Sequence, residues 1–230
     1  MKQYITLLLS AILLFSCQEK KEDIKPIIDY SNSTVVDSIM KGTPYSTDTI
    51  FLGLRLGMTK AEYKNHLESL KKEDNKLTFS SSNKISTMAG TFDLGAGYVY
   101  TTSISNEKDG KKLIGTGKYI LEPIYGNENT LVQLNIVPRE GWDNDSSSPH
   151  WLLDRIKKEY STSLDPLLME QLNNYEILNS YRFSGKKNNT IVYENLLTIS
   201  YASEKILLDT LLLNQIKQQV VEESKEDIKI

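Results

Sequence analysis

The stretch FDLGAGYVY, residues 92–100, decides the fold that we expect. An alternation of apolar and other residues with a period of two is typical of a β-strand that has one buried face. The stretch shows this alternation at five apolar positions, Phe92, Leu94, Ala96, Tyr98 and Tyr100. The same period extends in both directions, from residue 77 to residue 138. The sequence therefore predicts one half-buried strand over 92–100 within a longer run of strands.

Two turn signals divide this run into antiparallel strands. Asp109-Gly110 stands between two strand-like segments, and these two residues adopt a positive φ at low cost, as a tight hairpin requires. Gly126-Asn127-Glu128-Asn129 marks a second hairpin, which leads into a strand over 131–137. The sequence thus predicts an antiparallel meander.

A helix is predicted before the meander. Thr59 and Glu62 form the pattern T-x-x-E of a capping box, which starts a helix that continues to about Glu73. The helix follows a predicted strand over 49–54. Its core face is predicted from residues at helical spacing, Tyr63, His66, Leu67 and Leu70.

The second part of the chain shows a similar order of elements. Helices are predicted from Ser148-Pro149 to about residue 160 and from Asp165-Pro166 onward. Strands follow at 177–183, 190–193 and 196–201, and Ser203 caps a last helix with an inward face of Leu208, Leu211, Leu212 and Ile216. The expected fold class is α+β, with antiparallel meanders that each follow a helix. The predicted body, 48–222, has two similar halves, 48–140 and 141–222, and 223–230 is a charged tail.

The N-terminus has the pattern of a secretory signal peptide over residues 1–16. Lys2 gives it a positive start, and the apolar stretch from Tyr4 to Phe15 ends at the small residue Ser16. A transmembrane helix needs about 20 apolar residues, so this stretch is too short to span a bilayer. The sequence predicts export from the cytoplasm.

The end of this segment, Leu14-Phe15-Ser16-Cys17, resembles the lipobox of bacterial lipoproteins, although Phe15 departs from the small or branched residue usual there. The resemblance implies that Cys17 is acylated with palmitate-like chains and becomes the first mature residue, with membrane lipid as its partner. An ordinary secreted protein with an unrelated cysteine is the alternative. Cys17 is the single cysteine of the chain, which favours lipidation. Two or three acyl chains are sufficient for stable anchoring.

Residues 17–47 are polar, contain Pro26, Gly42 and Pro44, and show no sustained apolar period, so they predict a flexible tether. Such a tether has a root-mean-square reach of roughly 30 Å. Lys21-Glu22-Asp23 resembles export signals of surface lipoproteins in Bacteroidetes, and a solvated spacer is an equally good interpretation. We expect an outer-membrane lipoprotein, on either the periplasmic or the surface face.

A further resemblance concerns the start of the body. The segment Leu56-Gly57-Met58-Thr59 followed by a capped helix resembles the opening of small outer-membrane assembly lipoproteins of the BamE/SmpA type. It is also similar to tandem folds such as the β-lactamase inhibitory protein. Members of these families bind other proteins and are not enzymes. The resemblance implies a protein partner in the envelope.

Little in the sequence indicates catalysis. The chain has 27 basic and 30 acidic residues without a marked basic patch, so we expect no nucleic-acid partner. It lacks the G-x-S-x-G motif, and its two histidines, His66 and His150, are expected to be structural or surface residues. We expect no metal and no cofactor.

One loop has the residues of a possible binding site. Trp142 and Trp151 flank Asp143 and Asp145, and an aromatic ring beside carboxylates can stack on a sugar and hydrogen-bond to it. The structural alternative is that Trp151 anchors a helix in the core while the acidic residues solvate a turn. We therefore expect a lipid-anchored envelope protein that works by binding. The alternative function is a carbohydrate-binding or hydrolytic surface lipoprotein that uses the loop 142–151.

Overall fold

The computed structural model describes residues 27–73, 75–87, 90–108, 111–140, 156–160, 162–178, 183–194 and 198–226. It confirms the α+β class. Cys17 and the loop residues Trp142, Asp143 and Asp145 lie outside the described ranges, as does His150. In chain order the elements are α2 (Ser33–Gly42), η1 (Phe51–Gly53), α3 (Lys60–Glu73), β1 (Leu77–Ser80), β2 (Lys84–Thr87), β3 (Gly90–Asp93), β4 (Gly97–Lys108), β5 (Lys111–Tyr125), β6 (Leu131–Glu140), α5 (Pro166–Asn174), β7 (Ser184–Lys187), β8 (Thr190–Glu194), β9 (Ile199–Ser203) and α6 (Glu204–Glu226).

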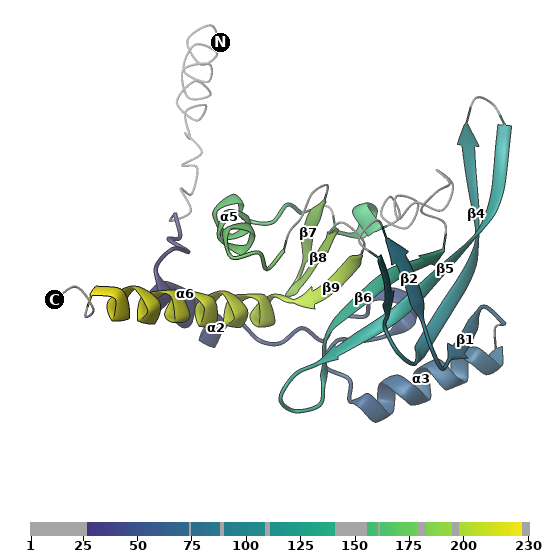
Figure 1. Cartoon of the computed structure of the whole chain (residues 1–230), viewed down its shortest axis with the longest axis horizontal. Helices are drawn as coiled ribbons and strands as arrows, with labels where there is room; N and C mark the ends of the chain where they lie inside the picture. Colours follow the sequence, from purple (N-terminus) through teal and green to yellow (C-terminus); the bar gives the residue numbers. More distant parts are fainter. Residues whose placement is uncertain are drawn as a thin grey trace, which may run out of the picture.

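The strands of the two predicted meanders join in one antiparallel sheet of seven strands, in the order β1-β4-β5-β6-β9-β8-β7 (Figure 1). The junction is the pairing of β6 with β9, in which Leu134 lies opposite Tyr201. Both predicted hairpins connect paired strands. The β4–β5 register continues to Lys108 opposite Lys111, and Gly126 and Thr130 close the turn between β5 and β6.

The prediction of one strand over 92–100 is wrong. Residues up to Asp93 belong to β3, which pairs only with β2 in a separate two-stranded sheet among the described strands, and β4 begins at Gly97. Gly95 has a φ of +77°, and its backbone N–H donates to Asp93 Oδ1 over 2.8 Å, so the chain turns between the two strands. Phe92, expected to be inward, is 49% exposed.

The capping box at the start of α3 is confirmed. The backbone N–H of Thr59 donates to Glu62 Oε2 over 2.7 Å, and the backbone N–H of Glu62 donates to Thr59 Oγ1 over 3.2 Å. The predicted strand over 49–54 does not form, because the chain makes the short turn η1, in which Leu52 has a φ of +57°. His66 Nε2 holds this turn through a 2.9 Å hydrogen bond with the Leu52 carbonyl oxygen, so its role is structural as predicted.

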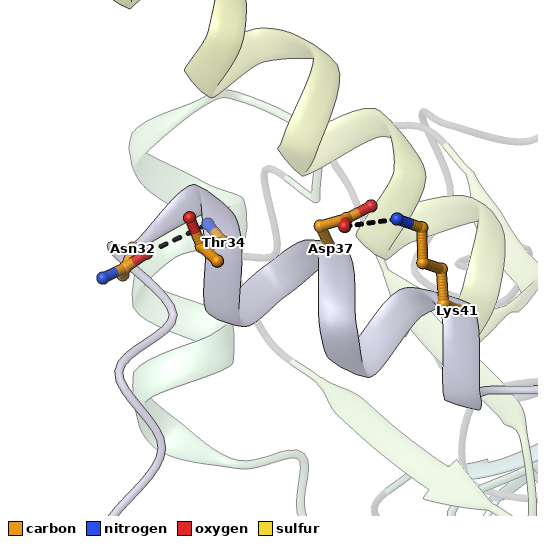
Figure 2. Close-up of polar contacts among 4 residues, drawn as sticks. All are labelled: Asn32, Thr34, Asp37 and Lys41. Carbon is orange, nitrogen blue, oxygen red and sulfur yellow. Dashed lines mark hydrogen bonds and ion pairs between the residues drawn. The ribbon is translucent and has the colours of Figure 1, made fainter.

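The predicted flexible tether is wrong from residue 27 onward. Residues 33–42 form α2, which lies along α6 (Figure 1), and Val36 is fully buried between them and their neighbours. The apolar face of α2 is short, only Val36, Ile39 and Met40, and it stands in an otherwise polar stretch, so its packing is not apparent from the sequence pattern. The helix is also well formed locally. Asn32 caps it by accepting from the backbone N–H of Thr34, and Lys41 pairs with Asp37 (Figure 2).

In the C-terminal part, the strands predicted over 190–193 and 196–201 correspond to β8 and β9, and most of the helix predicted from Ser148-Pro149 lies outside the described residues. Asp165 caps α5, as predicted. The strand expected over 177–183 is absent from its described residues, because Glu176 adopts a positive φ of 56° directly after α5 and redirects the chain, and β7 begins only at Ser184.

Helix α6 buries the predicted residues Leu208, Leu211 and Leu212, whereas Ile216, expected to be inward, is 44% exposed. From Leu213 onward it carries a stripe of exposed apolar residues, Leu213, Ile216, Val220 and Val221, which we call the α6 stripe. The outer end of α6 extends past the strands (Figure 1), and this explains the exposure. Within the described residues, α6 and the other helices are all too short or too polar to span a membrane.

Candidate functional site

A pocket of about 630 Å³ lies between helix α3 and the point where strand β4 begins. We call it the α3 pocket. Side chains from α3, from β1, from β5 and from the segment before β4 surround it. Its size is within the range of roughly 300–1,000 Å³ that is typical of small-molecule sites.

The pocket exists because β5 extends past the beginning of β4. The β4–β5 ladder ends with Tyr98 opposite Leu121, whereas β5 continues to Tyr125 and pairs with β6 on its other side. Among the described strands, none pairs with the β4 side of residues 122–125. The edge of β5 and the first turns of α3 therefore form the two sides of the pocket.

One wall of the pocket is aromatic. Tyr63 of α3 contacts the rings of Tyr98 and Tyr125 edge-on, with centroid distances of 6.4 and 6.2 Å. Phe79 of β1 contacts Tyr98 in the same way, at 5.2 Å. Edge-to-face contacts of this kind fix the rings relative to one another. The wall is thus a preformed apolar surface.

A hydrogen bond fixes the charges beside this wall. The hydroxyl of Tyr98 donates to Glu68 Oε1 over 2.8 Å. Burial and this hydrogen bond raise the pKa of Tyr98 to about 12, and the bond from Tyr98 lowers the pKa of Glu68 below its usual value. At neutral pH the phenol is therefore neutral, and Glu68 is a carboxylate that already has a partner.

Two buried polar atoms of the pocket residues have no hydrogen-bond partner among the described residues. They are Oη of Tyr63, a residue that is 4% exposed, and Oδ1 of Asn83, which is fully buried. The amide nitrogen of Asn83 donates to the Gly95 carbonyl oxygen over 2.9 Å, so its side chain is held in place. A buried polar group without a partner costs about 1–3 kcal/mol.

Three lysines of α3 line the pocket, Lys60, Lys64 and Lys71. Their spacing of four and seven residues places them on one side of the helix. Lys60 Nζ lies 5.9 Å from the centroid of the Tyr125 ring. The lining has two carboxylates. Glu68 accepts from Tyr98 and also lies 3.8 Å from Lys71 Nζ, and Glu122 accepts from Asn135 Nδ2 over 2.9 Å. The lysines make this side of the pocket positive.

The pocket was not predicted from the sequence. Tyr63 was assigned to the core and Tyr98 to a strand face, which is correct for both, but nothing placed them together around a cavity. The lysine spacing on α3 was the one available signal. The predicted site residues Trp142, Asp143 and Asp145 lie outside the described residues. In the part of the chain that the structure describes, no cluster of histidine, cysteine and carboxylate side chains could hold a metal ion.

No protein-family model matches the chain, and no curated protein and no solved structure matches it.

Proposed function

We propose that this protein is a lipid-anchored binding protein of the cell envelope and that its ligand occupies the α3 pocket. The observation that carries the proposal is the pocket itself, with its fixed aromatic wall. Concave sites that are mostly apolar and have a few oriented polar groups are typical of ligand binding.

The groups in the pocket support binding rather than catalysis. Hydrolysis by a pair of carboxylates requires one of them to have a raised pKa, so that it can act as an acid. The pKa of Glu68 is lowered instead, because Tyr98 donates a hydrogen bond to the carboxylate. Glu122 is engaged by Asn135. A non-enzymatic role therefore explains the arrangement better than hydrolysis.

In this proposal, acylated Cys17 anchors the protein in the outer membrane. The packed body begins within about 13 residues of this cysteine, since Tyr30 is already buried. A fully extended chain of 13 residues spans at most about 45 Å, so the body is held close to the lipid surface. A protein partner in the envelope remains part of the proposal. Labelling cells with an acyl-chain analogue is expected to mark the wild type but not Cys17→Ser, and equal labelling of both would contradict the anchor.

Binding in the pocket is tested with N-phenylnaphthylamine, an uncharged aromatic probe whose fluorescence rises in an apolar site. Ala96 is an exposed residue of the pocket lining, so Ala96→Trp is expected to fill the pocket without disturbing the core. We expect this change to weaken probe binding at least about tenfold, because the probe loses most of its apolar contact area.

The matched control is Ser38→Trp, which adds the same ring at an exposed position of α2. It is expected to leave probe binding unchanged. Because the α6 stripe is a competing apolar surface, Leu213→Ser with Val220→Ser is also expected to have no effect. Probe binding that survives Ala96→Trp and is lost in the α6 variant would contradict the proposed function.

A further inference from the structure

We infer that the ligand of the α3 pocket is a small amphiphile with a ring-containing apolar body and one acidic group, a carboxylate, sulfonate or phosphate. This inference rests on the proposed function and adds the chemical class of the ligand. Two properties of the pocket support it: the shape of its apolar wall and the sign of its charge.

The aromatic wall of the pocket favours an apolar body on the ligand. The rings of Tyr63, Tyr98 and Tyr125 are locked by their mutual edge contacts, and Leu121 and Pro123 of β5 add aliphatic surface. Tyrosine rings present large rigid surfaces at a small entropic cost. A flat ring can lie against such a wall, whereas a strongly hydrated body would lose its water without compensation.

The lysines of the pocket favour an acidic group on the ligand. Lys60 and Lys64 lie one turn apart near the start of α3, beside Tyr125 and the aromatic wall. The lining holds three lysines against two carboxylates, Glu68 and Glu122, so its formal charge is +1, and Lys71 is the lysine that pairs with Glu68. An ammonium group on a flexible stem suits a single anionic group whose position varies slightly.

The test compares two probes with the same aromatic body, the anionic anilinonaphthalene sulfonate and the neutral N-phenylnaphthylamine, on the full chain. In Lys60→Gln with Lys64→Gln, we expect the dissociation constant of the sulfonate to rise about tenfold. Each partly exposed ion pair contributes a factor of about two to five. The neutral probe is expected to change less than about twofold, because its contacts with the wall remain.

The matched control is Lys72→Gln with Lys217→Gln, which removes the same charge from two exposed lysines outside the pocket. It is expected to leave both dissociation constants unchanged. An equal loss of sulfonate binding in this control would show an effect of overall charge and would overturn the inference.

The two proposals fail in different ways. If Ala96→Trp abolishes binding of both probes while the Lys60 and Lys64 changes affect neither, the pocket binds ligands but does not select anions, and only the inference is wrong. If Ala96→Trp leaves both probes bound, the proposed function itself is wrong, and the inference falls with it. Loss of the sulfonate alone in the Lys60 and Lys64 variant supports both.

Discussion

Val36→Asp is expected to lower the free energy of unfolding by about 3–5 kcal/mol, because it places a carboxylate in a fully buried apolar contact. Val36 lies in the cluster formed by α2, α5 and α6, beside Leu208 and Leu211. If the helix detaches so that the charge reaches water, its packing against α6 is lost instead. Either outcome reduces the urea midpoint and exposes residues 27–47 to proteolysis.

Ser38→Asp is the control for this prediction. It introduces the same carboxylate two residues away, at an exposed position of the same helix. We expect it to change the unfolding free energy by less than about 0.5 kcal/mol, as is usual for surface substitutions. Equal stability of the two variants would show that α2 is not part of the body and would restore the flexible tether.

Gly185→Ala is expected to cost about 3 kcal/mol, a large effect for one methyl group. A Cβ at this position of β7 would overlap the backbone carbonyl oxygen of Tyr160 and would lie 2.6 Å from Phe183 Cζ. The carbonyl cannot move away cheaply, because the neighbouring backbone is fixed by the hydrogen bond from Lys186 N–H to the Thr162 carbonyl oxygen. Overpacking of this kind typically costs about 1–3 kcal/mol, and displacement of backbone places it at the upper end.

Gly42→Ala provides the comparison, measured by the same chemical unfolding experiment. Gly42 is the last residue of α2, and a Cβ there would have no atom within 4 Å. We expect a neutral or slightly stabilising change, since alanine restricts the unfolded chain more than glycine does. If Gly185→Ala is as harmless as Gly42→Ala, the close approach of β7 to Tyr160 is wrong.

The sequence predicts local features better than packing. The capping box of Thr59 and Glu62, the N-cap Asp165 and the turn between β5 and β6 depend on neighbouring residues, and the structure contains all three. The strand predicted over 92–100 is interrupted at Gly95, whose positive φ turns the chain despite the alternation of apolar residues. Helix α2 was missed because its three inward residues become meaningful only once α6 is beside them.

The pocket could not have been predicted from local sequence patterns. It depends on the offset between the beginning of β4 and the end of β5, and on the distance of α3 from both. These are relations between segments that are distant in the chain. The unpartnered atoms of Tyr63 and Asn83 likewise appear only when all their neighbours are placed. The lysine spacing on α3 was visible, but alone it indicates only a solvated helix face.

The most direct test of the central claim is an experimental structure of the full chain with bound anilinonaphthalene sulfonate. We predict that the naphthalene ring lies against Tyr98 and Tyr125 in the α3 pocket, with the sulfonate toward Lys60 and Lys64. A probe that lies instead on the α6 stripe, at Leu213 and Val220, would contradict the assignment of the pocket as the binding site.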